Sequence, residues 1–312
     1  MSVSVHFAHV TDVHISERGD SWGTLGDLGP RLLRECFARL NQIDDLDFVL
    51  ITGDVLDLAT SGELSLFMEA LGTLRKPWHF VPGNHDGFIH ESYPAAFRPA
   101  EALPIIDPRL ADPPPEANRA YWSRTVKPGI QLIGLDSRIA DDWAGEIGPA
   151  QLDWLRSELA AQAGSAVLIA IHHPTRLLGP HNRRPWWDKF ILRNGEAVER
   201  LLDQHTNVRL VIAGHHHANH IAQCGARLHL TTAALSGYPC AYRTIRLASE
   251  NGQWRVRIET HTVADGDTLE LARARLLDSD TARRFDSGNP AAWVAFCAGR
   301  PSDRHFDGVV AG

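Results

Sequence analysis

Five short apolar segments of the chain each stop at a polar residue that can bind a metal ion or move a proton. One of them, residues 48–51, leads into Gly53 and Asp54. A run of β-branched and aromatic residues that ends at a glycine is typical of a buried strand. In open α/β sheets, chemistry collects beyond the carboxyl ends of the strands. We therefore predict an α/β fold in which the other four strand ends converge on Asp54.

Helical patterns separate these strands. Residues 30–40 have Pro30 in the expected first turn, and residues 61–74 have Ser61 as the expected N-cap. This β-α-β-α-β order favours a parallel sheet with right-handed crossovers. Further strands are predicted at residues 121–126, 130–135, 166–171 and 208–213, helices at 149–159 and 196–205, and antiparallel strands of a second sheet around residues 221, 228–231, 242–247 and 254–258.

Composition excludes several function classes. The net charge of −7 argues against a nucleic-acid-binding surface, which normally carries a basic excess. The first residues contain neither a basic region nor a long apolar segment, so we expect no signal peptide, no membrane span and a cytoplasmic location. The four cysteines lie far apart and are expected to be buried thiols. The proline-rich residues 87–119 are predicted to be a surface excursion.

The strand ends supply only oxygen and imidazole donors, which suit Fe, Mn or Zn. Seven candidate ligands exceed the usual share of one ion, so they indicate two ions about 3.5–4 Å apart that share a carboxylate. Asp54 is the expected bridge, and a water between the ions would act as hydroxide. We expect Asp12, His14 and His217 to complete one ion and Asn84, His172 and His215 to complete the other.

Several of these residues have simpler explanations. Asp12 and Asn84 could be turn residues, and Asn84 could serve as both turn residue and ligand. His172 and His173 compete for one position, and strand alternation turns His173 and His216 to the opposite face. His181 and Arg183 could contact a substrate phosphate, although charged loop residues are more often merely exposed.

The motifs together resemble the calcineurin-like metallophosphoesterases over residues 5 to 260. The blocks are D-x-H at 12–14, G-D-x-x-D at 53–57, G-N-H-D at 83–86, H-x-P at 172–174 and G-H-x-H at 214–217. The resemblance implies a four-layer αββα sandwich of two mixed sheets and phosphoester hydrolysis by a metal-bridging hydroxide. It also implies that His85 stabilises the phosphoryl group or protonates the leaving oxygen and that Asp57 orients His85. We expect a catalytic domain over residues 1–262 and a C-terminal extension of unknown role over 263–312.

A second set of residues narrows the resemblance. Leu-Asp-Ser at 135–137, Gly145-Glu146 and the stretch 151–155 resemble the branch of bacterial cyclic-nucleotide (class III) and glycerophosphodiester phosphodiesterases. Leu58 and Ala59 follow the second block where protein phosphatases have Arg-Gly. We therefore expect a phosphodiesterase that acts on a small-molecule phosphoester bound in part by Asn84 and His85. A homo-oligomer is compatible with the sequence. The alternatives are a phosphomonoesterase, a nucleotide-conjugate pyrophosphatase, and a binding module without activity.

Overall fold

The computed structural model describes residues 3–19, 22–86, 99–110, 119–140, 142–250 and 252–310, and in these it forms two six-stranded sheets. The first has the order β14 (His305–Val310), β13 (Gln253–Thr262), β12 (Ala241–Glu250), β1 (Ser4–Val10), β2 (Phe48–Ile51) and β3 (Trp78–Phe80). The second has the order β10 (His220–Cys224), β11 (Arg227–Thr231), β9 (Val208–Ala213), β8 (Ala166–Ile171), β5 (Ile130–Leu135) and β4 (Trp122–Lys127).

The first sheet contains the predicted parallel unit. β1, β2 and β3 are parallel neighbours, and α1 (Gly29–Leu40) and α2 (Ser61–Leu71) connect and cover them. The N-cap of α2 is Thr60 and not Ser61, because the Thr60 hydroxyl accepts the N–H of Glu63 in a capping box. The proline-rich stretch lies largely outside the described residues. Its described part includes α3 (Pro99–Ile106), whose Leu103 and Ile106 are buried in the core.

The strands between residues 220 and 262 divide between the two sheets. β10 and β11 extend the second sheet, with β11 parallel to β9, whereas β12 pairs antiparallel with β1 in the first sheet. The prediction that all of these strands belong to the second sheet is therefore wrong for β12 and β13, which join the first sheet. The physical reason is that β1 has a free edge opposite β2, and a long strand covering it satisfies its backbone groups.

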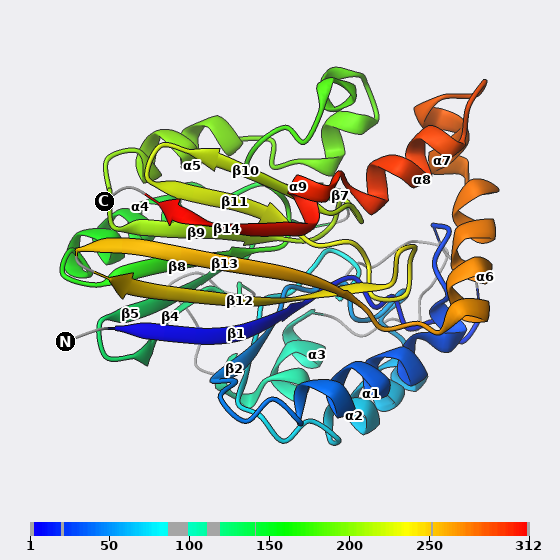
Figure 1. The fold of residues 1–312 in the computed structure, drawn as a ribbon, viewed down its shortest axis with the longest axis horizontal. Coiled ribbons are helices and arrows are strands. Elements are labelled where there is room, and N and C mark those ends of the chain that lie inside the picture. The colour runs from blue at the N-terminus through cyan, green and yellow to red at the C-terminus, as the bar shows by residue number, and fades with distance from the viewer. Residues whose placement is uncertain are drawn as a thin grey trace.

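The two sheets face each other across a core that includes Phe7, Leu168, Leu210 and Ile245. On the outer face of the second sheet lie α4 (Pro149–Ala161) and α5 (Gly195–Leu202). Together with α1 and α2 on the other side, they give the expected four-layer α/β sandwich of two mixed sheets (Figure 1). No helix in the described ranges is long and apolar enough to cross a membrane.

The C-terminal segment is packed against both sheets. Its last strand, β14, pairs with β13 at the edge of the first sheet. Helices α6 (Gly266–Leu277), α7 (Asp280–Phe285) and α8 (Ala291–Ala298) lie at one end of the sandwich, on the right of Figure 1. Trp293 of α8 packs there in an aromatic cluster with Trp187 and Phe190. The boundary at residue 262 stays a prediction, but the segment beyond it supplies an edge strand and one wall of the pocket described below.

Candidate metal centre

The carboxyl ends of five strands meet at one end of the sandwich. Asp12 and His14 follow β1, Asp54 follows β2, and Asn84 and His85 follow β3 in the first sheet; His172 follows β8, and His215 and His217 follow β9 in the second. Asp12, Asp54 and His172 are at most 1 % exposed. The structure therefore brings all seven predicted ligands together at the junction of the two sheets.

Asp54 lies between two groups of imidazoles. Its Oδ2 is 3.1 Å from Nε2 of His172 and 3.7 Å from Nε2 of His14. On the side of His14, Nε2 of His217 is 3.0 Å from Nε2 of His14 and 3.3 Å from Oδ1 of Asp12. Asp12, His14 and His217 are close enough to share one ion, and so are Asp12, Asp54 and His172.

The tautomers of two histidines are fixed by backbone carbonyls. Nδ1 of His172 donates to the carbonyl of Thr52 (2.6 Å), and Nε2 of His215 donates to the carbonyl of Lys189 (3.2 Å). Their other nitrogens, which then carry lone pairs, face each other at 3.2 Å. The carbonyls thus direct Nε2 of His172 and Nδ1 of His215 at the centre, and imidazoles held in this way are typical metal ligands.

A buried amide oxygen also lacks a partner. Oδ1 of Asn84 is buried and accepts no hydrogen bond within the described part of the chain. A buried acceptor without a donor is costly, and a bound cation would satisfy this oxygen. The neighbouring backbone packs closely on Asp54. The N–H of His85 donates to Oδ1 of Asp54 (2.8 Å), and a Cβ on Gly83 would collide with the Asp54 carboxylate. The residues present thus fit a metal centre.

The backbone at the strand ends is strained. Five of the seven candidate ligands have positive φ angles between 44° and 63°, namely Asp12, His14, Asp54, His215 and His217. Residues other than glycine rarely adopt this conformation, and where they do it often marks a functional site. The buried carboxylate of Asp86 supports one of these turns by accepting the N–H groups of Asp54, Val55, Leu56 and Gly83.

His85 lies at the edge of the centre and is held by Asp57. Its Nδ1 donates to the backbone carbonyl of Asp57 (2.6 Å), whereas the Asp57 carboxylate is 3.7 Å from that nitrogen. The orienting group is therefore the carbonyl rather than the side chain. Burial lowers the pKa of His85, but the charges of Asp54 and Asp57 outweigh burial, so the pKa is raised above its usual value.

The other candidate histidines lie behind the centre. The ring of His173 is 4.1 Å from that of His215, so the prediction that it turns to the opposite face is wrong. His216 points away from Asp54 into the aromatic cluster, where its Nε2 is 3.1 Å from Nε2 of His181. His181 is buried there, and the exposed Arg183 lines a different depression, so neither lies beside the candidate ligands.

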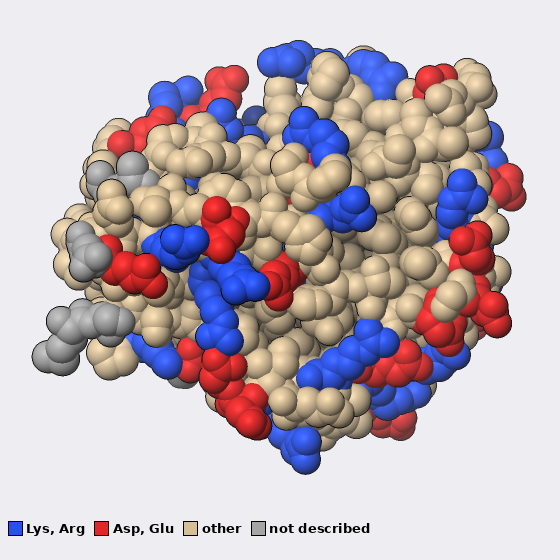
Figure 2. Space-filling view, in the orientation of Figure 1, with Lys and Arg blue, Asp and Glu red and all other residues tan. Residues whose placement is uncertain are grey.

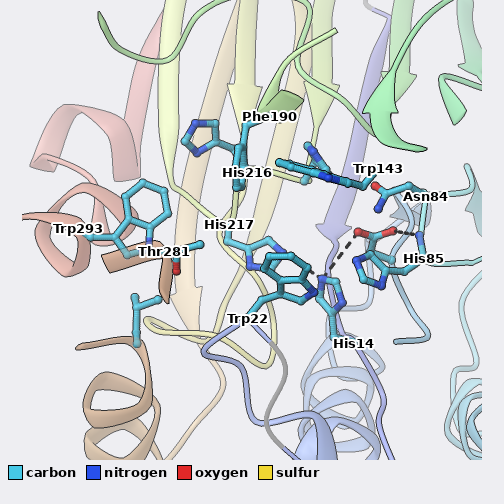
Figure 3. Close-up of a pocket in the computed structure, with 13 residues that line it drawn as sticks. His14, Trp22, Asn84, His85, Trp143, Phe190, His216, His217, Thr281 and Trp293 are labelled. Carbon is cyan, nitrogen blue, oxygen red and sulfur yellow. Dashed lines mark hydrogen bonds and ion pairs between the residues drawn. The ribbon is translucent and has the colours of Figure 1, made fainter. Parts of the chain in front are cut away.

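A pocket that encloses about 480 Å³, part of it open to solvent, lies over the centre (Figure 3). Five candidate ligands line it beside His85, namely His14, Asp54, Asn84, His215 and His217. Sequence reasoning assigned no pocket role to the rest of the wall, because no periodic pattern marks residues that converge from separate loops and helices. These wall residues include Trp22, Trp143, Phe190, Leu276, Thr281 and Trp293.

Comparisons with known proteins agree with this geometry. The profile of the calcineurin-like phosphoesterase family matches residues 5–219. A 3',5'-cyclic-nucleotide phosphodiesterase of Nostoc sp. is 25% identical over 269 residues, which cover 82% of this chain and 92% of the relative. A probable glycerophosphodiester phosphodiesterase of Arcobacter nitrofigilis is 29% identical over 67% of this chain and 70% of its own length. The crystal structure of a dimetal phosphatase from Danio rerio shares the fold, with a TM-score of 0.66 at 18% identity over 84% of this chain and 97% of that one.

Proposed function

Since the chain belongs to the calcineurin-like phosphoesterase family, we propose that it hydrolyses a small phosphodiester of the cyclic-nucleotide or glycerophosphodiester type at a centre of two metal ions. The observation that carries the proposal is the position of the Asp54 carboxylate, whose Oδ2 is within 3.7 Å of imidazoles from both sheets. A carboxylate in this position can be shared by two ions held about 3.5–4 Å apart.

In this proposal each ion has three further ligands. Asp12, His14 and His217 hold the first ion, and Asn84, His172 and His215 hold the second. Fe, Mn and Zn are the metals that suit these donors. When bound, the ions supply Lewis acidity and lower the pKa of a coordinated water. The carbonyls of Thr52 and Lys189 keep the lone pairs of His172 and His215 directed at the centre.

His85 is the proposed proton donor to the leaving oxygen. Its Nδ1 proton is engaged by the Asp57 carbonyl, so the proton to be transferred is on Nε2. The neighbouring Asp54 and Asp57 charges raise its pKa, which favours the protonated form that a general acid needs. Asp57 acts as a positioning residue that keeps the ring of His85 at the edge of the pocket.

The pocket wall favours a diester over a monoester. Among the described residues that line it, none is lysine or arginine. A phosphate monoester carries about one more negative charge at neutral pH than a diester, and that charge normally requires additional cationic groups. Figure 2 shows one face of the molecule, on which basic and acidic side chains are interspersed rather than gathered in a basic surface.

Hydrolysis of paired chromogenic substrates tests the proposal. We expect protein loaded with Mn, Fe or Zn to hydrolyse bis(p-nitrophenyl) phosphate with a higher kcat/KM than p-nitrophenyl phosphate. Asp54→Asn should abolish diester turnover because the shared ligand is lost, and His85→Ala should lower kcat for the diester by at least about 100-fold, as is usual when a general acid is removed. The control is His205→Ala, which removes a histidine after α5, outside the pocket. Absence of diester turnover with every metal, or full turnover in both site variants, contradicts the proposal.

A further inference from the structure

We propose that Trp22, backed by Trp143, is a specificity-determining residue that stacks on a planar aromatic group of the substrate. This inference rests on the proposed function and deepens it, because it selects nucleobase-bearing or aryl diesters over diesters of glycerol. The two tryptophans come from separate loops, one after β1 and one within the hairpin strand β7 (Asp142–Gly145).

Trp22 lies at the mouth of the pocket, next to the proposed acid. Its ring centroid is 6.3 Å from that of His85 and 6.3 Å from that of Trp143. Trp22 lines the same pocket as His14 and His217 (Figure 3). A phosphoryl group bound near His85 places its ester substituent a few ångströms farther out, which is where the Trp22 ring lies.

The Trp22 side chain is partly open to solvent. The residue exposes 43 % of its surface, more than any other tryptophan in the described part of the chain. A large aromatic side chain left in water at the mouth of a binding pocket gains free energy when a planar ligand covers it. Trp143, in contrast, is fixed: Phe190 packs edge-on at 5.2 Å, and Nζ of Lys189 lies 5.2 Å from its ring centroid.

The rest of the wall offers little to a polar substituent. Beyond the candidate ligands and His85, the described lining residues are Phe190, Leu276, Thr281, Trp293 and the two tryptophans, with His216 behind them. Only the Thr281 hydroxyl there is a small neutral polar group. A glycerol or ethanolamine moiety leaves its hydroxyl or ammonium groups unpaired in such a pocket, whereas a nucleobase buries its ring faces.

The loop that carries Trp22 is held in place before any ligand binds. The N–H of Leu25 donates to the carbonyl of Ser236 (2.8 Å), and Thr24 forms a β-bridge with Gly237. Gly23 packs so closely on the C-terminal segment that a Cβ there would lie 3.0 Å from Cβ of Ser279. A stacking face that is already ordered does not lose conformational entropy on binding, so the contact contributes more to affinity.

Steady-state kinetics on two natural-type diesters test this inference. The substrates are 3',5'-cyclic AMP, which has a purine, and glycerophosphoethanolamine, which has no ring. Stacking of one base is worth about 1–3 kcal/mol, so Trp22→Ala should raise KM for cyclic AMP roughly 5- to 150-fold. We expect kcat for cyclic AMP and KM for glycerophosphoethanolamine to change less than about twofold, and Trp22→Phe to retain most of the affinity. Leu177→Ala, which truncates an exposed apolar residue outside this pocket, is the matched control.

The outcomes separate the inference from the proposed function. If Trp22→Ala raises KM for both diesters equally, or for neither, the stacking role is refuted while the phosphodiesterase proposal stands. If the metal-loaded protein hydrolyses neither diester, the proposed function fails. Calorimetric binding of adenosine 5'-monophosphate then decides the role of Trp22: weaker binding in Trp22→Ala than in Trp22→Phe supports stacking, and equal affinity overturns it.

Discussion

Asp86 is a buried carboxylate that holds the Asp54 turn without belonging to the candidate ligands. Its two oxygens accept four backbone N–H groups at 2.8–3.1 Å. Burial and the nearby charge of Asp54 raise its pKa to about 6. Because Asp86 is the acceptor for all four N–H groups, the geometry of the candidate metal centre depends on a residue that is not itself a candidate ligand.

We predict that Asp86→Asn destabilises the protein and weakens metal binding. The amide turns an N–H₂ group toward backbone donors and leaves buried N–H groups unpaired, at a cost of about 2–4 kcal/mol. Urea unfolding in a chelator measures the stability, and metal content after dialysis measures binding. The control is Asp153→Asn, because the Asp153 side chain is 76 % exposed. Wild-type stability in Asp86→Asn would refute the assigned role.

His9 predicts how stability depends on pH. Its imidazole is fully buried between the hydroxyls of Thr52 and Thr232, at 2.7 Å from each. Burial, aided by the charge of Arg243, lowers the pKa of His9 to about 3, against about 6.5 in the unfolded chain. Between these two pH values the unfolded state binds a proton that the folded state does not. The contribution of neutral His9 to the free energy of unfolding is therefore complete above pH 6.5 and declines as the pH falls.

The comparison of wild type with His9→Gln isolates this contribution. At pH 8 the variant should be less stable by about 1–3 kcal/mol, because buried hydroxyls lose a partner. Glutamine does not titrate, so the stability gap should shrink by roughly 1–2 kcal/mol between pH 8 and pH 5. Urea unfolding at the two pH values, in a chelator, measures the gap. A gap that is constant or that widens toward pH 5 contradicts the assigned burial of His9.

Among the individual residues, those that directly follow a strand could be predicted from the sequence. Asp54 could be found because an apolar run stops at Gly53, and the convergence of all seven candidates followed from the rule for strand ends. His173 could not, because β8 ends at Ile171 and the alternation of side chains does not extend into the turn that follows. Trp22 could not either, since its position depends on contacts with residues more than 200 positions later in the chain.

Among the elements, α6 and the turn before α7 support the Trp22 loop. Gly23 has a φ of +79° and faces the backbone of Leu276 and the side chain of Ser279. The guanidinium of Arg275 also donates to the carbonyl of Thr24 (3.4 Å). Strand and helix positions were predictable from apolar periodicity, and β8 and β9 match their predicted ranges. The support of this loop by the C-terminal segment was not predictable, because no local pattern encodes a contact between distant segments.

Gly23→Val should displace this loop and impair stacking. The added side chain collides with Leu276 and Ser279, so KM for cyclic AMP should rise as in Trp22→Ala while metal content stays unchanged. Gly252→Val is a matched control, because Gly252 has the same φ of +79° but no neighbouring atom within 4 Å of an added Cβ. It therefore reproduces the backbone strain without the collision. Equal effects of the two substitutions on KM would assign the change to strain alone.

Across the whole molecule, the candidate metal centre lies where the two sheets meet. Asp12, His14, Asp54 and Asn84 extend from the first sheet, and His172, His215 and His217 extend from the second. Two carboxylates and several imidazoles are held close together there on strained backbone. This donor set exists only in the folded state, so an ion that binds it would couple metal binding to the association of the two sheets.

Metal removal should therefore lower the thermal stability of the entire fold. A ligand present at about 100 times its Kd stabilises the folded state by about 2.7 kcal/mol per site. For a chain of this length, that corresponds to a shift in Tm of about 4 °C per ion, hence about 8 °C for two. Differential scanning calorimetry with and without a chelator measures the shift. If Asp54 is shared by both ions, Asp54→Asn should lose most of the shift, whereas His217→Ala should lose about half. Equal, half-sized losses in both variants would mean that Asp54 serves one ion only.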